Sequence, residues 1–408
     1  MNKFTEGYKT PGYYIRKRLK KNTPAFIGLL IITASIISSF FGYLVMPDQT
    51  PDANDGAVQI QKQSPGFEAT FLKIRKNRVI EKRNLFQKAI YGQESEYMIV
   101  PILDYEIDYL TIKVNVFGKS NYRKEYFILD VVKPMSFNSS ELIYEIAGET
   151  YLEFINVLGE KEKISYKELV DEFHEKNIEK RTYWFGTDKM GRDMLSRLLF
   201  GTRISLSIGF ISVLISMFLG LSLGSMAGYF GGRIDMFILW FLSVVWSIPG
   251  IILVIAISMA LQSRGVWVAF VAVGLTMWVD VARVMRGQIM AIKGKLFVEA
   301  ARAFGNTNFR IMFVHILPNI SGPLIVIATA NFAAAIILEA GLSFLGLGVQ
   351  PPTPSWGVMI YEGFQAIGTK NSLHLILFPG LAICILVLSF NLLGNGLRDA
   401  YDPKTLLD

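Results

Sequence analysis

Metal-binding and nucleophilic side chains are scarce in this chain of 408 residues. It has three histidines and one cysteine: His174, His315, His374 and Cys384. His174-Glu175 begins like the zinc motif His-Glu-x-x-His, but residue 178 is isoleucine, so the second ligand is missing. A phosphate-binding Gly-x4-Gly-Lys-Ser/Thr loop is also missing, because Gly294-Lys295 is followed by leucine. The sequence therefore predicts no catalytic residue, no metal site and no cofactor or nucleotide bound by this chain.

A polar stretch between two apolar segments is the strongest candidate for a functional contact. It runs from Glu299 to Asn319 and reads EAARAFGNTNFRIMFVHILPN. Good helix formers precede Gly305, which can end a helix in the left-handed conformation, and Thr307 can cap a second short helix that ends near Pro318. The pattern predicts a helix, a tight break and another helix. From the residues alone, either a docking surface for another protein or an ordinary amphipathic connector would fit.

The chain as a whole has the composition of a membrane protein. It is 51% hydrophobic and only 18% charged, against roughly a quarter charged in an average globular domain. Six apolar segments approach or exceed the roughly 20 residues that a helix needs to cross a bilayer. They are Asn22–Pro47, Ile204–Gly232, Met236–Ser263, Val266–Val279, Ile316–Leu338 and Asn371–Leu397. The first is longer than the core of a signal peptide and lacks a cleavage site, so it predicts a retained anchor.

The distribution of Lys and Arg predicts the orientation of these spans. Residues 1–24 contain seven basic residues and residues 283–318 contain six, whereas the loops near Arg264 and Lys370 contain one each. Six spans with both termini in the cytoplasm fit this distribution. Arg192, Arg197 and Arg203 would then lie outside, in a long loop where the charge rule is weaker.

Residues 48–183 differ from the rest, because they are charge-rich and contain no apolar span. Partial alternation predicts strands, the stretch 118–121 predicts a turn, and residues 48–66 have the composition of a linker. The predicted strands are Met98–Tyr109, Leu110–Phe117, Glu125–Val132 and Glu141–Ile146, and the predicted helix is Lys167–Lys180. The stretch is expected to form a small α+β domain outside the membrane, acting as a spacer or docking module.

These expectations divide the chain into six parts. They are a basic cytoplasmic N-terminus (1–24), a first transmembrane helix (25–47), the extracytoplasmic insertion (48–183), an outer amphipathic segment (184–203), a transmembrane core (204–397) containing the cytoplasmic region 283–319, and a cytoplasmic tail (398–408).

Four stretches resemble a known family. Glu299-Ala300-Ala301, with Gly305 six residues after Glu299 and His315-x-Leu317-Pro318-Asn319 at the end, resembles the EAA motif of ABC-importer permeases. Three more stretches resemble the second permease subunit of dipeptide, oligopeptide and nickel importers. They are Phe185–Arg197 (FGTDKMGRDMLSR), Gly341–Gly357 (GLSFLGLGVQPPTPSWG) and Phe378-Pro379-Gly380 followed by Asn391–Gly394 and Gly396–Ala400. The resemblance covers residues 184–408 closely and 1–47 loosely, and leaves the insertion uncovered.

The resemblance implies a type I ABC importer permease: an all-α polytopic protein with six transmembrane helices, here with an inserted α+β domain. It implies a non-catalytic subunit that forms half of a pathway for peptides or similar small solutes in the bacterial inner membrane. The implied partners are a homologous second permease, two ATPase subunits that bind ATP and Mg, and an extracytoplasmic solute-binding protein, with no role for nucleic acid. The residues implied to couple the chain to an ATPase are Glu299, Ala300, Ala301, Arg302, Gly305, His315, Leu317 and Pro318.

Polar residues inside the spans are candidates for the transport pathway, because they are expensive in lipid. These candidates are Thr276, Asn331, Glu339 and Asn391, each with an interhelical hydrogen bond as the alternative role; for Glu339, as for Asp280, that alternative is favoured. Pro249-Gly250 and Pro379-Gly380 are expected to kink the third and sixth helices. Ser355–Ile367 predicts a short amphipathic outer helix.

Three other protein classes remain as alternatives. An ABC mechanotransmission protein also has a large outer domain after its first helix, but it has four spans and no EAA stretch. A membrane-anchored enzyme would need an active site in residues 48–183, where His, Cys and metal spacing are poor. A secondary transporter is disfavoured because no inverted repeat is evident.

Overall fold

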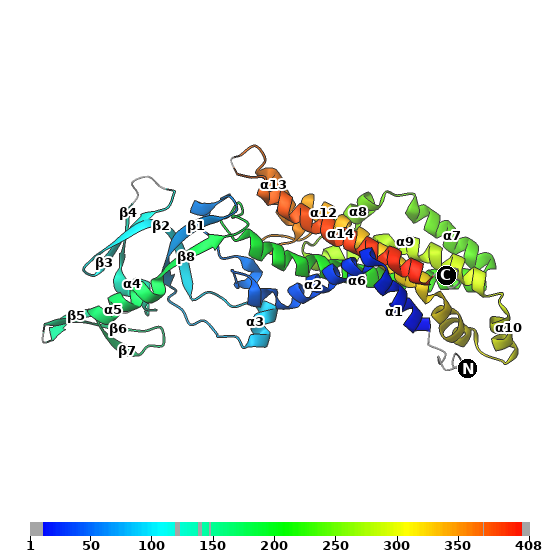
Figure 1. Cartoon of the computed structure of the whole chain (residues 1–408), viewed down its shortest axis with the longest axis horizontal. Coiled ribbons are helices and arrows are strands. Elements are labelled where there is room, and N and C mark those ends of the chain that lie inside the picture. Colours follow the sequence, from blue (N-terminus) through cyan, green and yellow to red (C-terminus); the bar gives the residue numbers. More distant parts are fainter. Residues whose placement is uncertain (1–10, 119–122, 138–140, 147, 370, 402–408) are drawn as a thin grey trace, which may run out of the picture. The chain divides into compact units, whose positions relative to one another are not determined.

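The computed structural model describes residues 11–118, 123–137, 141–146, 148–369 and 371–401. The predicted turn at 118–121, the first ten residues and most of the predicted C-terminal tail therefore lie largely outside the described residues. The chain forms two compact units, which are treated separately (Figure 1). The first unit comprises residues 1–39, 201–361 and 379–408, and the second comprises residues 40–200 and 362–378.

The first unit is helical, and its long helices are apolar enough to cross a membrane. The helices are α1 (Pro11–Lys21), α2 (Thr23–Val45), α6 (Met194–Phe230), α7 (Gly232–Trp246), α8 (Gly250–Ala260), α9 (Val266–Ile292), α10 (Leu296–Ala303), α11 (Asn308–Arg310), α12 (Ser321–Phe344), α13 (Trp356–Gln365) and α14 (His374–Tyr401), some of which extend into the second unit. Within the described residues, five helical segments pass as spans, and six do if α7 and α8 form one span. That pair is bent by 91° at its break, where Pro249 precedes the first residue of α8.

Several predicted helix boundaries need correction. The second span begins at Met194 rather than Ile204, and α9 continues past Asp280 to Ile292. Asp280, which suggested the end of the fourth span, lies inside α9. The backbone hydrogen bonds of a helix do not depend on side-chain polarity, so a helix can continue past the end of its apolar part. Pro379-Gly380 lies within the helix α14, where the sequence predicts a kink rather than an end.

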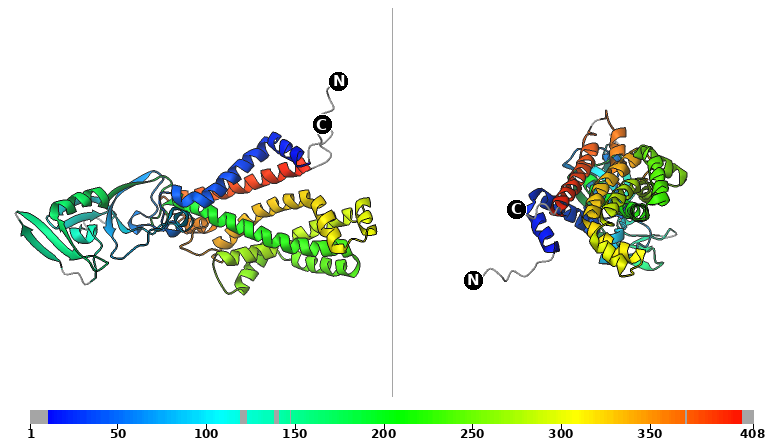
Figure 2. Two further views of the ribbon diagram at one scale, coloured as in Figure 1. Left: turned by 90° about the horizontal axis from the view of Figure 1, so that it is seen from below. Right: turned by 90° about the vertical axis from the view of Figure 1, so that its right-hand side faces the viewer.

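Glycines allow the closest helix contacts in this unit. Gly28 of α2 faces the main chain of α14, where an added Cβ would lie 2.6 Å from the Ser389 carbonyl oxygen. Accordingly, α2 (blue) runs beside α14 (red) in Figure 2. Gly220, Gly224 and Gly228 of α6 face α9 in the same way. Small residues four apart form a stripe along a helix and let two backbones approach.

The second unit contains two antiparallel sheets. The larger sheet has the order β4-β3-β2-β1-β8, and the smaller has the order β5-β6-β7. The strands are β1 (Phe67–Arg75), β2 (Tyr97–Asp108), β3 (Thr111–Val116), β4 (Arg123–Phe127), β5 (Leu142–Ile146), β6 (Glu149–Ile155), β7 (Lys161–Ser165) and β8 (Ile178–Tyr183). Three short helices accompany them: α3 (Leu85–Tyr91), α4 (Ile128–Val132) and α5 (Tyr166–Glu172). The described part of 48–183 is therefore an α+β fold.

One hydrophobic core joins the two sheets and the helices α4 and α5. It contains Leu72 and Val114 from the large sheet, Leu152 from the small sheet, and Leu129 and Leu169 from the helices. All five side chains are fully buried. The described part of residues 48–183 therefore folds around a core of its own.

Two predictions in this unit are partly wrong. The predicted strand Glu125–Val132 changes to helix at Ile128, where the four apolar residues of the short helix α4 are buried and Asp130 is exposed. The predicted helix Lys167–Lys180 gives way to β8 at Ile178, after a π-helical turn. The buried Asn177 marks this change, because its side-chain amide donates to the carbonyls of Lys73 (2.6 Å) and Val131 (2.9 Å).

The stretch 48–66 is folded, so the linker prediction is wrong. Ala53 and Ile60 are fully buried, and Gly56 forms a β-bridge with Arg192. Its Pro, Gln, Asp and Gly residues form turns against neighbouring segments instead of a flexible connection.

Candidate functional site

The stretch from Glu299 to Asn319 has the predicted helix, break and helix. The helix α10 ends in a Schellman motif: the Gly305 N–H donates to the Arg302 carbonyl (2.9 Å) and the Asn306 N–H to the Ala301 carbonyl (3.2 Å). Gly305 has φ +76°, a conformation that favours glycine. The Thr307 hydroxyl then accepts a hydrogen bond from the Arg310 N–H (3.3 Å) and caps α11. We call residues 296–310 the α10–α11 hairpin.

The inner face of the α10–α11 hairpin is packed against the unit's own helices. Val298 and Ala301 are buried in a cluster with Ile289 of α9 and Ile316. The Tyr229 hydroxyl of α6 donates to the Asn308 side chain (2.8 Å). The hairpin is therefore held as a rigid attachment to α6 and α9.

The outer face of the hairpin is exposed and unusually apolar. Phe304 is 87% exposed and Phe309 is 71% exposed. Among the predicted coupling residues, Glu299, Ala300, Arg302, Gly305 and Pro318 are exposed, His315 and Leu317 are half-buried, and Ala301 is buried. The predicted end of the second helix near Pro318 is wrong. The chain continues from α11 through a π-helical turn and a 3-10 turn containing Pro318 directly into α12, so Pro318 lies within a helical run.

The predicted pathway residues are in different environments. Glu339 is fully buried in α12, and its carboxylate accepts a hydrogen bond from the Ser343 hydroxyl (2.7 Å) on the next turn. Asn331, two turns earlier, is also buried, whereas Asn391 of α14 is exposed in this chain. Thr276 is half-buried and its hydroxyl donates to the Ala272 carbonyl (2.8 Å) within α9.

A break in the helical path lies next to one of these residues. A Cβ added at Gly250, the first residue of α8, would lie 3.6 Å from the Thr276 methyl group. A Cβ added at Gly341 of α12 would lie 3.4 Å from the Cδ1 atom of Ile251. The turn at Pro249-Gly250 is thus placed between α9 and α12, beside Thr276.

Sequence reasoning missed a buried charge cluster in the second unit. Arg192 pairs with Asp188 (2.6 Å) and Glu362 (3.3 Å), and Arg197 pairs with the same two carboxylates at 3.3 and 3.7 Å. All four residues are at least 95% buried. We call them the Arg192–Glu362 cluster. It fixes the stretch before α6 to the end of α13. The single acidic residue in the otherwise uncharged predicted outer helix was the available signal.

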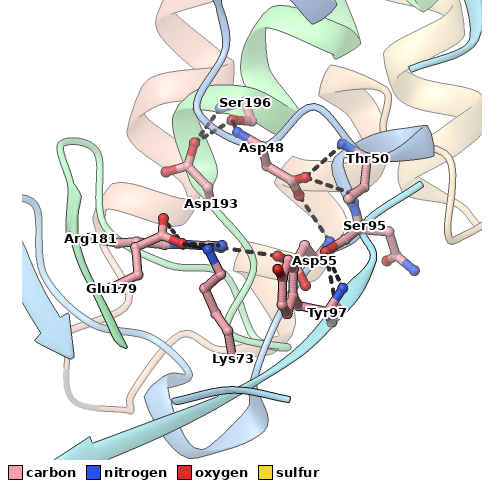
Figure 3. A network of polar contacts seen from close by, with 11 residues as sticks. Asp48, Thr50, Asp55, Lys73, Ser95, Tyr97, Glu179, Arg181, Asp193 and Ser196 are labelled. Carbon is pink, nitrogen blue, oxygen red and sulfur yellow. Dashed lines mark hydrogen bonds and ion pairs between the residues drawn. The ribbon is translucent and has the colours of Figure 1, made fainter. Parts of the chain in front are cut away.

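A second polar network joins the end of α2 to β8 and the start of α6 (Figure 3). The Asp48 carboxylate accepts hydrogen bonds from the Thr50 N–H (2.9 Å), the Thr50 hydroxyl (2.6 Å) and the Asp55 N–H (2.9 Å). Arg181 bridges Asp55 (3.0 Å) and Glu179 (2.8 Å). Two cavities of about 470 and 320 Å³ adjoin this network and share Asp48, Asp55 and Arg181 in their walls.

Burial governs the charge state of two carboxyls in this network. It raises the pKa of Asp48 from 3.8 to about 6, although the hydrogen bonds to Thr50 and Asp55 favour the ionised form. Burial also raises the pKa of Asp193, whose carboxylate accepts from the Ser196 N–H (2.7 Å) and hydroxyl (2.5 Å). The carboxylates of Asp48 and Asp193 accept their hydrogen bonds from other groups of the same chain. The network therefore holds the segment after α2 and the start of α6 in place.

Lower pH is expected to stabilise the second unit through Asp48. Because its folded pKa lies above its unfolded value of 3.8, the folded state binds more protons between these values, and stability is gained as the pH falls from about 7 to 4. One site with this difference contributes on the order of 3 kcal/mol. Unfolding of wild type and Asp48→Asn should be compared at pH 7, 6 and 5; the wild type should gain stability relative to the variant. Parallel pH profiles would contradict the assignment.

No cluster of three or more His, Cys, Asp or Glu side chains suited to a metal ion occurs in the described ranges. His174, the start of the incomplete zinc motif, instead lies 3.2 Å from the Tyr105 hydroxyl through its Nδ1.

The helical part of the chain is similar to known transport proteins. Residues 220–407 match the family described as "Binding-protein-dependent transport system inner membrane component". The chain is 43% identical to the glutathione transport system permease protein of Pectobacterium atrosepticum over 222 residues, 54% of this chain and 73% of that protein. It is 38% identical to the oligopeptide transport system permease protein of Bacillus subtilis over 224 residues, 55% of this chain and 72% of the relative.

A solved structure is similar over the same share of the chain. An inward-facing structure of the MetNI methionine ABC transporter aligns with 51% of this chain and 98% of its own, at 21% identity and a TM-score of 0.44. The sequence relatives are decisive, because they are well above 30% identical and are themselves mostly covered. The chain therefore belongs to the family of binding-protein-dependent transport system inner membrane components, the inner-membrane permease subunits of ABC importers.

Proposed function

We propose that this permease subunit forms half of a transmembrane pathway for peptides and that the α10–α11 hairpin couples it to an ATPase. The relatives carry the names of dipeptide, oligopeptide and glutathione permeases, which favours short peptides as the solute class. A homologous second permease would complete the pathway. Two ATPase subunits that bind ATP and Mg would supply energy, and an extracytoplasmic binding protein would deliver the solute. The chain itself contributes no catalytic group or cofactor site to this proposal.

The exposed outer face of the hairpin carries the coupling proposal. Phe304 and Phe309 expose large aromatic surfaces, although the inner face of the same element is well packed. Aromatic residues and arginine are enriched in protein interfaces, so the exposed Phe304 and Phe309 near Arg302 fit an interface. The Schellman motif and the Thr307 cap hold this surface in one shape, so a push from a bound ATPase would pass through α10 to α9 and α12.

The proposed arrangement in the membrane follows from placing the α10–α11 hairpin on the ATPase side. The bent pair α7–α8 is counted as one span, which makes six spans and puts both termini and the hairpin in the cytoplasm of a bacterial cell. The α+β unit then lies outside, between the first and second spans, where it would meet the binding protein or its solute. The buried Asn331, with Thr276 beside the Pro249-Gly250 break, is proposed to lie on the pathway side. For Glu339 the hydrogen-bonding role stays the favoured one, because its carboxylate is fully buried and bonded to Ser343. Asn391 is proposed to face the second permease, because it is exposed in this chain.

The change Gly305→Pro should uncouple ATP hydrolysis from transport. Proline fixes φ near −65° and lacks the N–H that Gly305 donates to Arg302, so the Schellman motif cannot form. We expect substrate-stimulated ATPase activity and transport of the purified complex to fall by roughly tenfold or more, a loss of about 1.4 kcal/mol or more of coupling.

A matched control separates uncoupling from misfolding. Gly368 also has a positive φ of 83° and open space around it, but lies outside the hairpin. Gly368→Pro should leave stimulated ATPase activity near wild type. A Gly305→Pro complex that assembles normally and keeps full substrate-stimulated activity would refute the coupling role.

A further inference from the structure

Helix α1 is strongly basic and is joined to the first span by one residue. It carries five cations, Arg16, Lys17, Arg18, Lys20 and Lys21. No Asp or Glu occurs between residues 7 and 47. Only Asn22 separates α1 from α2, and its side chain accepts a hydrogen bond from the Ala25 N–H (3.2 Å) at the start of α2. A dense positive charge therefore lies within about two helical turns of the end of a membrane-capable helix.

The corner between α1 and α2 is held by the end of α14. The Arg18 guanidinium donates to the Ala400 carbonyl (3.3 Å). Gly396 of α14 lies so close to the corner that an added Cβ would be 2.2 Å from the Ala25 Cβ and 3.5 Å from a Leu19 methyl group. These contacts fix the direction in which α1 leaves the span and leave its other cations available.

A groove of about 460 Å³ lies between α1 and α2. It is lined by Tyr13, Arg16, Lys17, Leu19, Lys20, Phe26 and Leu29. Residues 13, 16, 17 and 20 have the spacing of one helix face, so three of the five cations are gathered on one side of α1. Phe26 and Leu29 are on the membrane-capable α2. One wall of the groove is therefore cationic and the other is apolar.

Among the described residues, no carboxylate forms an ion pair with the cations that line the groove. Arg16, Lys17 and Lys20 are exposed, and no ion pair involves them within the described part of the chain. Arg16 and Lys20 are four residues apart on one helix, where like charges repel. A bound anion would relieve this repulsion, and an apolar chain would cover Phe26 and Leu29.

We propose that the α1–α2 groove binds an anionic phospholipid, with the headgroup phosphate between Lys17 and Lys20 and an acyl chain along Phe26 and Leu29. A lipid matches both walls of the groove, whereas a free phosphate ion would match only the cationic wall. Clusters of Lys and Arg next to a span are attracted to anionic headgroups. This site is separate from the pathway and from the α10–α11 hairpin, and it would anchor the corner that Arg18 and Gly396 fix.

The test is lipid binding by the full-length protein in detergent micelles. Phosphatidylglycerol or phosphatidylcholine is titrated in, and the rise in the midpoint of thermal unfolding gives an apparent Kd. Wild type should respond to phosphatidylglycerol and much less to phosphatidylcholine. Lys17→Gln with Lys20→Gln should weaken the apparent Kd by about 10- to 30-fold, the loss expected for two headgroup contacts.

The control variant has the same charge change outside the groove. Lys21→Gln with Arg398→Gln alters two exposed cations that do not line it and should respond as wild type does. Without lipid, both variants should unfold near the wild-type midpoint. An equal loss in both variants, or an unchanged response of Lys17→Gln with Lys20→Gln, would overturn the site. Inorganic phosphate reproducing the whole shift would identify a free anion as the ligand and overturn the lipid assignment.

Discussion

Replacing Glu362 with alanine is expected to lower the free energy of unfolding by about 3–5 kcal/mol. Glu362 is 96% buried and pairs with both Arg192 and Arg197. Without it, Asp188 is the remaining carboxylate among the described ion pairs of the two buried guanidinium groups, so positive charge is left in excess in a low-dielectric environment. Such a charge is far more damaging than the loss of an exposed ion pair, which contributes about 0–1 kcal/mol. Chemical unfolding of the detergent-solubilised full-length protein would measure the change.

A double variant distinguishes charge imbalance from lost packing. Glu362→Leu with Arg197→Met leaves Arg192 and Asp188 as a balanced pair and replaces the other pair by apolar side chains. Replacing a buried ion pair by apolar residues is often neutral or stabilising. The double variant should therefore be more stable than Glu362→Leu alone by about 2 kcal/mol or more. Equal stability of the two would mean that Glu362 acts through shape rather than charge.

This cluster also shows why part of the architecture could not be predicted. Asp188, Arg192 and Arg197 lie in one short stretch, but their partner Glu362 is more than 160 residues away. The sequence does not show which distant charged residues will pair. An arginine or glutamate is the same residue type whether it is exposed or buried in the folded chain. The spans, in contrast, depend on local length and apolarity, and each predicted span overlaps a membrane-capable helix or the bent α7–α8 pair.

The α+β unit was predicted as a class but not in its pairings. The strand β1 lies between β2 and the edge strand β8 in the larger sheet, with Leu72 opposite Val100 of β2 and Ile178 of β8. Its buried residues do not alternate strictly, so its sequence does not display the strand period. The apolar run that begins at Ile128 was predicted as a strand but is the helix α4. A short apolar run fits a buried strand and a buried helix equally well.

The α10–α11 hairpin was predicted more closely, because its signals are local. Gly305 and Thr307 act within a few residues of themselves, and the helix end and cap they indicate are both present. The exposed Phe304 and Phe309 were not singled out, since exposure depends on which neighbours cover a side chain.

The second large effect is expected in the glycine stripe of α6. A Cβ at Gly224 would lie 2.4 Å from the Ala282 carbonyl oxygen of α9, and one at Gly228 would lie 2.8 Å from the Arg286 carbonyl oxygen. Main-chain atoms cannot rotate away as a flexible side chain can. The two helices would have to separate, and the contacts of Trp278 and Ala282 in the buried cluster between them would be lost.

Gly224→Ala is therefore expected to destabilise the protein by about 3 kcal/mol or more, at or above the upper end of overpacking effects. Gly287→Ala is the matched control, because it makes the same chemical change within α9 where an added Cβ meets no atom within 4 Å. Alanine has the higher helix propensity, so this control should be neutral or stabilised by up to about 1 kcal/mol. The two variants differ only in whether a backbone lies against the new methyl group. Equal stability of both, measured by unfolding of the purified chain, would show that α6 and α9 do not depend on this close approach.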